Sequence, residues 1–139
     1  MNRGCVIVAK LNQAMKDMIA GELSYISTVD ADGNPDVGPK ISMRVLDDEH
    51  LIYNEMTGGQ TQANINDNGK AIVAVANAKA LKGFRFGGTA KLYTDGPYYD
   101  QAAKWAEGKF PVPKGAGVIT IDKIWTLDPG PKAGKLFEG

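Results

Sequence analysis

Residues 37–66, VGPKISMRVLDDEHLIYNEMTGGQTQANIN, constrain the fold more than any other part of the chain. Polar and apolar residues alternate here in the order Lys40, Ile41, Ser42, Met43, Arg44 and Val45. Because a strand sends successive side chains to opposite faces, this alternation predicts one strand over residues 36–46. One face would be apolar, and the other would carry two cations and a hydroxyl. An acidic turn over residues 47–49 and a second strand over residues 50–54 complete a predicted antiparallel pair.

The glycine-marked segment TGGQT, residues 57–61, follows the second strand and leads into a helix predicted over residues 60–67. The free N–H groups at a helix N-terminus favour an anion, and a nearby Arg or Lys would add charge-assisted bonds to a phosphate. The sequence therefore suggests a phosphate site beside the polar strand face. Two alternatives stay open, because Thr and Gly are common helix-capping residues and Lys40 and Arg44 could simply protect an edge strand from aggregation.

Further elements are predicted along the rest of the chain. Helical spacing of apolar residues favours helices over residues 10–21 and 98–107, and alternation favours strands over residues 23–29, 83–94 and 118–125. The continuous apolar run AIVAVA, residues 71–76, predicts a central strand buried on both faces. Gly87 and Gly88 interrupt one strand and predict a bulge or a sharp bend there.

These elements predict a mainly β (α+β) fold. About six antiparallel strands joined by short turns, with three peripheral helices, favour a small curled β-barrel. At 139 residues the chain is large enough for a core of its own. We expect one domain over residues 1–139, with a core over residues 10–127 and a surface tail rich in proline and glycine.

Charge and composition exclude several classes of function. Sixteen basic and sixteen acidic residues cancel, so no overall field gathers nucleic acid or an anionic membrane. With one cysteine, Cys5, and one histidine, His50, the chain forms no intramolecular disulfide and offers no Cys/His metal cluster. We expect a cytoplasmic protein without a signal peptide or membrane span. No nucleophile and base can be paired, so any redox chemistry would come from a cofactor.

Several segments resemble one known family. They are the hairpin DADGNPDVGPK, the strand pair around LDDEHLIYN, the helix start GGQTQANI, the strand AIVAVA, and GGTAKLYTDGP before a helix. In this order and spacing, residues 10–127 resemble the flavin-binding split β-barrel proteins related to pyridoxamine 5′-phosphate oxidase. The short bacterial FMN-binding members are the most similar.

The resemblance implies an FMN-binding split barrel that forms a homodimer with FMN at the subunit interface. The strand matching residues 40–44 would contact the flavin ring and its phosphate side chain, residues 54–56 the ring, and Gln60 and Thr61 the phosphate. Trp105 and Trp125 would approach the flavin of the partner subunit. The implied cofactor-binding residues are Lys40, Ile41, Ser42, Arg44, Asn54, Glu55, Met56, Thr57, Gln60, Thr61, Trp105 and Trp125.

The chain also departs from the family pattern. Gln60 stands where many relatives have Lys or Arg, so the phosphate would rely more on Thr61, the helix amides, and Lys40 or Arg44. A longer C-terminal segment with its arginine motif is absent, so we do not expect a true pyridoxamine phosphate oxidase. The expected function is an FMN-dependent oxidoreductase that receives electrons from a nicotinamide or a protein. The alternatives are a non-enzymatic flavin-binding or electron-transfer module, a haem or deazaflavin binder, and an oligonucleotide-binding barrel.

Overall fold

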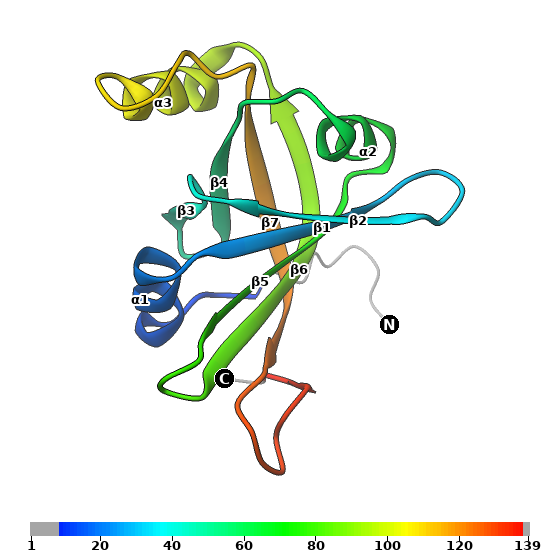
Figure 1. The fold of residues 1–139 in the computed structure, drawn as a ribbon, viewed down its shortest axis with the longest axis vertical. Coiled ribbons are helices and arrows are strands. Elements are labelled where there is room, and N and C mark those ends of the chain that lie inside the picture. The colour runs from blue at the N-terminus through cyan, green and yellow to red at the C-terminus, as the bar shows by residue number, and fades with distance from the viewer. Residues whose placement is uncertain (1–8, 138–139) are drawn as a thin grey trace.

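The computed structural model describes residues 9–137, so Cys5 lies outside the described residues. One eight-stranded antiparallel sheet and three helices make up the fold (Figure 1). The helices are α1 (Gln13–Gly21), α2 (Gln60–Asn68) and α3 (Gly96–Ala106). The strands are β1 (Ser24–Val29), β2 (Pro35–Lys40), β3 (Arg44–Asp47), β4 (His50–Glu55), β5 (Lys70–Asn77), β6 (Lys82–Tyr93), β7 (Gly115–Thr126) and β8 (Lys135–Leu136).

The sheet runs in the order β2-β1-β5-β6-β7-β4-β3, with β8 added beside β7. Strands β6 and β7 are the longest and cross behind β1 and β2 in Figure 1, which shows how strongly the sheet curls. Their pairing register shifts between Gly87 and Gly88, which confirms the predicted bulge. A side chain at Gly88 would collide with the backbone carbonyl of Thr120 on β7, so only glycine allows the two strands to approach at this bend.

The predicted strand over residues 36–46 is wrong, because the chain turns after Lys40. The Met43 N–H donates to the Lys40 carbonyl at 3.0 Å, and β3 begins only at Arg44. Strands β2 and β3 therefore lie at opposite ends of the strand order, with only residues 41–43 between them. Such a short connection brings the two sheet edges together, so the sheet must close on itself. This break and the added β8 raise the strand number from the expected six to eight.

Strand β5 lies inside the sheet, between β1 and β6. Only one of its two faces is buried. Ala71, Val73 and Val75 face the core, whereas the Ile72 side chain is 37% exposed. The prediction of a strand buried on both faces is therefore wrong. Small apolar residues on alternate positions of β5 lie on an open outer face of the sheet.

Two apolar clusters hold the elements together. The larger cluster fills the curled sheet and includes Met15 and Ile19 of α1, which are almost wholly buried. The smaller cluster joins Ala102 of α3 to β4 and β7 through Ile52 and Val118. Helix α3 is thereby fixed over the end of β4, and this placement creates the pocket described next.

Candidate functional site: a pocket between β2, β4 and α3

A pocket of about 300 Å³ opens where the end of β2, the end of β4 and the C-terminal end of α3 meet. Its lining is mostly apolar, and Lys40 is the one titratable side chain among the described residues that line it. The lining residues are Leu23, Pro39, Lys40, Ile41, Ser42, Asn54, Met56, Thr57, Trp105 and Phe110. The turn over residues 41–43 carries Ile41 and Ser42 into the lining, so the break between β2 and β3 shapes this site.

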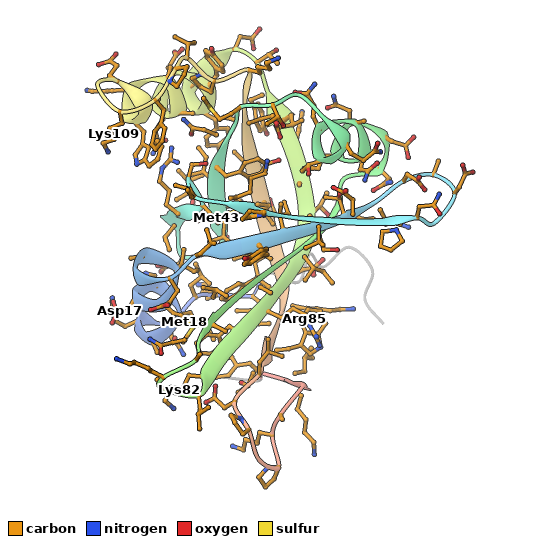
Figure 2. The ribbon with its side chains drawn as sticks, in the orientation of Figure 1. Asp17, Met18, Met43, Lys82, Arg85 and Lys109 are labelled. Carbon is orange, nitrogen blue, oxygen red and sulfur yellow. The ribbon has the colours of Figure 1, made fainter. Side chains whose placement is uncertain are left out.

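The outer wall of the pocket is aromatic. Trp105 and Phe110 stack with ring centroids 5.5 Å apart and an interplanar angle of 10°. Two cations lie against the Trp105 ring: the Arg44 guanidinium carbon is 4.2 Å from its centroid and Lys109 Nζ is 4.7 Å from it. Lys109 projects from the segment after α3 (Figure 2). A flat aromatic wall offers a stacking surface for a planar ring, and the cations beside it favour a ligand that carries negative charge.

Arg44 lies behind this wall and does not line the pocket. Its Nη1 donates to the Ser42 carbonyl at 2.8 Å, and its Nη2 donates to Asn54 Oδ1 at 3.2 Å. Asn54 in turn donates from Nδ2 to the Ala102 carbonyl of α3 at 2.9 Å. Burial lowers the pKa of Arg44 to about 10, so the guanidinium stays charged at neutral pH. Arg44 therefore links the turn after β2, strand β4 and helix α3.

Lys40 meets a buried carboxylate at the inner end of the pocket. Lys40 Nζ lies 3.6 Å from Glu55 Oε1 and 5.2 Å from the centroid of the Tyr53 ring. The other oxygen, Glu55 Oε2, accepts hydrogen bonds from the Gly58 N–H at 2.9 Å and from the N–H and hydroxyl of Thr57, each at 3.1 Å. Burial, followed by the charge of Glu55, raises the pKa of Tyr53, so this phenol stays neutral.

Helix α2 begins beside the same turn. Its N-cap is Gly59, which provides no side-chain capping bond, so the first N–H groups of the helix have no cap among the described residues. Gln60 Nε2 donates to Asn64 Oδ1 at 2.7 Å, and the Thr61 hydroxyl donates to Asp36 Oδ2 at 3.3 Å. Neither Gln60 nor Thr61 lines the pocket. The Asp36 carboxylate weakens the attraction of this helix end for an anion.

The side chain of Lys114 supplies an opposite charge at this helix end. A Cβ at Gly58, whose φ is +66°, would lie 3.1 Å from Lys114 Cδ and 3.5 Å from Lys114 Nζ. Sequence reasoning missed Lys114, Phe110 and the side chain of Glu55. Only the third had a local signal, since a carboxylate two residues before a Thr-Gly turn often accepts the turn's N–H groups.

Trp125 lies elsewhere, on the outer face of β6 and β7. The Arg85 guanidinium carbon is 4.8 Å from its ring centroid, and its ring covers Gly87. Figure 2 shows Arg85 projecting from β6 away from α1. Trp125 does not line the pocket of its own chain, and its expected approach to the flavin of a partner subunit stays a prediction.

Residues 9–137 contain neither a metal-ligand cluster nor a membrane-spanning helix. No group of three or more His, Cys, Asp or Glu side chains there is placed to hold a metal ion. No helix in the same residues combines the length and the apolar character needed to cross a lipid bilayer. His50 pairs with Asp47, its Nδ1 lying 2.7 Å from Asp47 Oδ1, in the turn between β3 and β4.

The curled sheet forms a small barrel with a pocket at its side, and comparison with known proteins gives its family. The family model described as pyridoxamine 5′-phosphate oxidase matches residues 11–128. The chain belongs to the pyridoxamine 5′-phosphate oxidase-like FMN-binding family, and its antiparallel sheet with three helices has the split-barrel fold of that family. The predicted family and fold class are thereby confirmed.

Three relatives illustrate the similarity. An uncharacterised protein of Methanocaldococcus jannaschii is 35% identical over 134 residues, which cover 94% of this chain and 89% of that protein. The crystal structure of HupZ from Group A Streptococcus is 49% identical, with a TM-score of 0.84, and the match covers 89% of this chain and 99% of that chain. An FMN-binding protein of Syntrophomonas wolfei shares the fold, with a TM-score of 0.71, 21% identity and coverage of 83% and 84%.

Proposed function

We propose that this protein is an FMN-binding flavoprotein that moves electrons or hydride through its bound flavin. The supporting observation is the pocket itself, which combines the stacked wall of Trp105 and Phe110 with the Lys40 ammonium. The FMN-binding protein of Syntrophomonas wolfei has the same fold, and this also favours FMN as the ligand.

The residues present fit a phosphorylated planar ring. The pocket offers apolar and aromatic surface for the ring, and Glu55 Oε1 is a wholly buried acceptor without a hydrogen bond from the described residues. Ser42, Asn54 and Thr57 add polar atoms to the lining. The start of α2, which no described side chain caps, and the adjacent Lys114 suit the phosphate, and Asp36 opposes it. Lys114 would therefore supply the charge that relatives provide at the position of Gln60.

When bound, FMN would accept a hydride or pass one or two electrons onward. The protein would bind and orient the ring and set its electrostatic surroundings. Lys40, at the pocket surface, would stabilise negative charge on the ring and so favour the reduced state. Arg44 would act at longer range, because it lies behind Trp105.

We further propose a homodimer with FMN at the subunit interface. Proteins of this family are often dimers. Around the pocket several large apolar side chains are exposed, including Leu23 (44%), Ile41 (77%), Phe110 (44%) and Val112 (76%). Exposed apolar side chains gathered at a pocket mouth are typical of a surface that a partner covers. The outer face carrying Trp125 and Ile72 is a second apolar surface that a partner chain could meet.

A non-enzymatic flavin-binding or electron-transfer module is the second candidate. It is favoured by the lining of the pocket, where no described carboxylate, histidine or cysteine is placed to exchange a proton with an organic substrate. The two functions differ in turnover. A flavin that is bleached by reduced nicotinamide and reoxidised repeatedly by an added acceptor indicates an oxidoreductase, whereas bleaching without turnover indicates a carrier.

The visible spectrum of the purified protein is the first test. A flavin spectrum, FMN as the released chromophore, and the mass of two chains in solution would support the proposal. A colourless protein that takes up no FMN when the cofactor is added in excess would refute it.

A further inference from the structure

Glu55 is the most deeply buried charged residue beside the pocket. Its side chain has no exposed surface, yet its carboxylate is shared between two parts of the site. Oε2 accepts three hydrogen bonds from the turn at Thr57 and Gly58. Oε1 accepts none from the described residues and lies 3.6 Å from Lys40 Nζ, which is an ion-pair distance beyond hydrogen-bond reach.

These contacts join the end of β2 to the turn before α2. The turn at Thr57 and Gly58 leads into α2, where the phosphate of the proposed ligand would bind, whereas Lys40 ends β2 and faces the ring end of the pocket. A buried carboxylate is strongly unfavourable unless hydrogen bonds and an opposite charge compensate it. The turn amides and Lys40 therefore have to stay where Glu55 places them.

We propose that Glu55 is the positioning residue of the pocket, fixing the turn before α2 with one carboxylate oxygen and the Lys40 ammonium with the other. This inference rests on the proposed FMN-binding function and gives the Glu55 side chain a role that it exerts through the turn and Lys40. It also sets the charge of the site, because Glu55 pairs with Lys40, the one titratable side chain among the described residues of the lining.

The ion pair between Lys40 and Glu55 predicts different effects for the two single variants. Lys40→Met leaves a buried carboxylate without its counter-charge, next to the place where an anionic ligand binds. Glu55→Gln leaves an ammonium that retains 14% exposure of its side chain and favours the anion. Lys40→Met is therefore the harmful change for both stability and FMN binding, and adding Glu55→Gln to it removes the cause of the harm.

The test compares the wild type, K40M, E55Q and the K40M/E55Q double variant, with Glu107→Gln as the control. Glu107 is an exposed carboxylate at the C-cap of α3. Without ligand, we expect K40M to lower the thermal midpoint by at least about 4 °C and the double variant to recover most of that loss. On titration with FMN, we expect K40M to bind at least about tenfold more weakly and the double variant to bind within about threefold of the wild type.

Amide hydrogen exchange of the unliganded protein tests the hydrogen bonds that Glu55 Oε2 accepts. In Glu55→Ala the Thr57 and Gly58 amides should exchange at least about tenfold faster, while the amides of β4 and β7 keep their wild-type rates. If Glu55→Ala does not fold, the same amides are followed in E55Q, where the remaining amide oxygen can accept from only one part of the site at a time. E55Q should then also accelerate exchange of the Thr57 and Gly58 amides.

The inference is overturned if the double variant is no more stable than K40M, or if the Thr57 and Gly58 amides keep their wild-type exchange in the Glu55 variant that folds. Should the wild-type protein take up no FMN, the proposed function fails by itself. The thermal and exchange measurements on the unliganded chain still decide whether Glu55 positions the turn and Lys40.

Discussion

Replacing Arg44 with alanine should weaken both the fold and the binding of FMN. The change removes a 2.8 Å bond to the Ser42 carbonyl, a 3.2 Å bond to Asn54 and the contact with the Trp105 ring at 4.2 Å. A hydrogen bond to a charged group contributes about 1.5–3 kcal/mol, and a partly buried cation–π contact adds about 1 kcal/mol. Because part of this is regained by hydration of the exposed groups, we expect an unfolding free energy lower by about 2–3 kcal/mol.

The affinity for FMN should fall together with the unfolding free energy, since Arg44 holds Trp105, Asn54 and the turn at Ser42 in place. A loss of about 1.5–3 kcal/mol corresponds to a dissociation constant raised about 10- to 150-fold. Arg44→Lys should recover little, because an ammonium cannot make both hydrogen bonds while stacking on the indole ring.

Urea unfolding and quenching of FMN fluorescence measure the two quantities on the same preparations. The control is Lys82→Ala, which removes an exposed ion pair with Asp128 at 3.5 Å and should change neither. If Arg44→Ala keeps the wild-type unfolding free energy while FMN binding falls, Arg44 contacts the ligand directly and does not act through the aromatic wall. If neither the unfolding free energy nor the FMN affinity changes, the contacts of Arg44 do not stabilise the fold or the pocket, and the assignment is refuted.

Three further changes test other parts of the site. Lys114→Ala should weaken FMN at least about tenfold and leave riboflavin, which has no phosphate, unaffected, as measured by competitive fluorescence titration; equal losses for both ligands would remove Lys114 from the phosphate site. Tyr53→Phe removes a buried hydroxyl that has no hydrogen-bond partner within residues 9–137, and it should raise the unfolding free energy by about 1 kcal/mol at pH 7. Because the folded state raises the pKa of Tyr53, the wild type should also lose stability as the pH rises above about 10, where the unfolded tyrosine ionises first. That loss should be smaller in Tyr53→Phe, and identical pH profiles would contradict the assignment. Gly88→Ala places a methyl group against the Thr120 carbonyl and should cost at least about 3 kcal/mol, measured by urea unfolding; a loss below about 1 kcal/mol would show that the bulge can relax.

Much of the fold could be predicted because its signals are local. Helices α1 and α3 follow from the spacing of apolar residues, and α2 follows from the glycine-marked segment before it. The Gly87-Gly88 bulge follows from two residues without side chains inside an alternating strand. The break between β2 and β3 could not be predicted in this way. Residues 41–43 are Ile, Ser and Met, which include no Gly, Pro, Asn or Asp, and the alternation continues through them. The chain turns here because the sheet closes on itself. Closure depends on contacts between strands that are distant in the sequence, so it leaves no local signal.

The residues of the candidate site also differ in how far the sequence predicts them. The residues near Lys40 and Asn54 were expected together from the resemblance, and the pocket includes most of them. Phe110 reaches the pocket only because α3 packs on β4, and its own segment reads as an ordinary proline- and glycine-rich loop. The buried role of Glu55 was hidden for another reason. A carboxylate at the end of an apolar strand gives no sign in the sequence of the lysine that faces it from β2.

Titration of the cofactor-free protein with FMN, followed by the change in flavin fluorescence, tests the central claim most directly. We expect saturable binding with one FMN per chain, weakened in Trp105→Ala, whose ring forms the pocket wall. Fluorescence that stays unchanged up to a large excess of FMN, on a protein shown to be folded, would contradict the assignment of this pocket to a flavin.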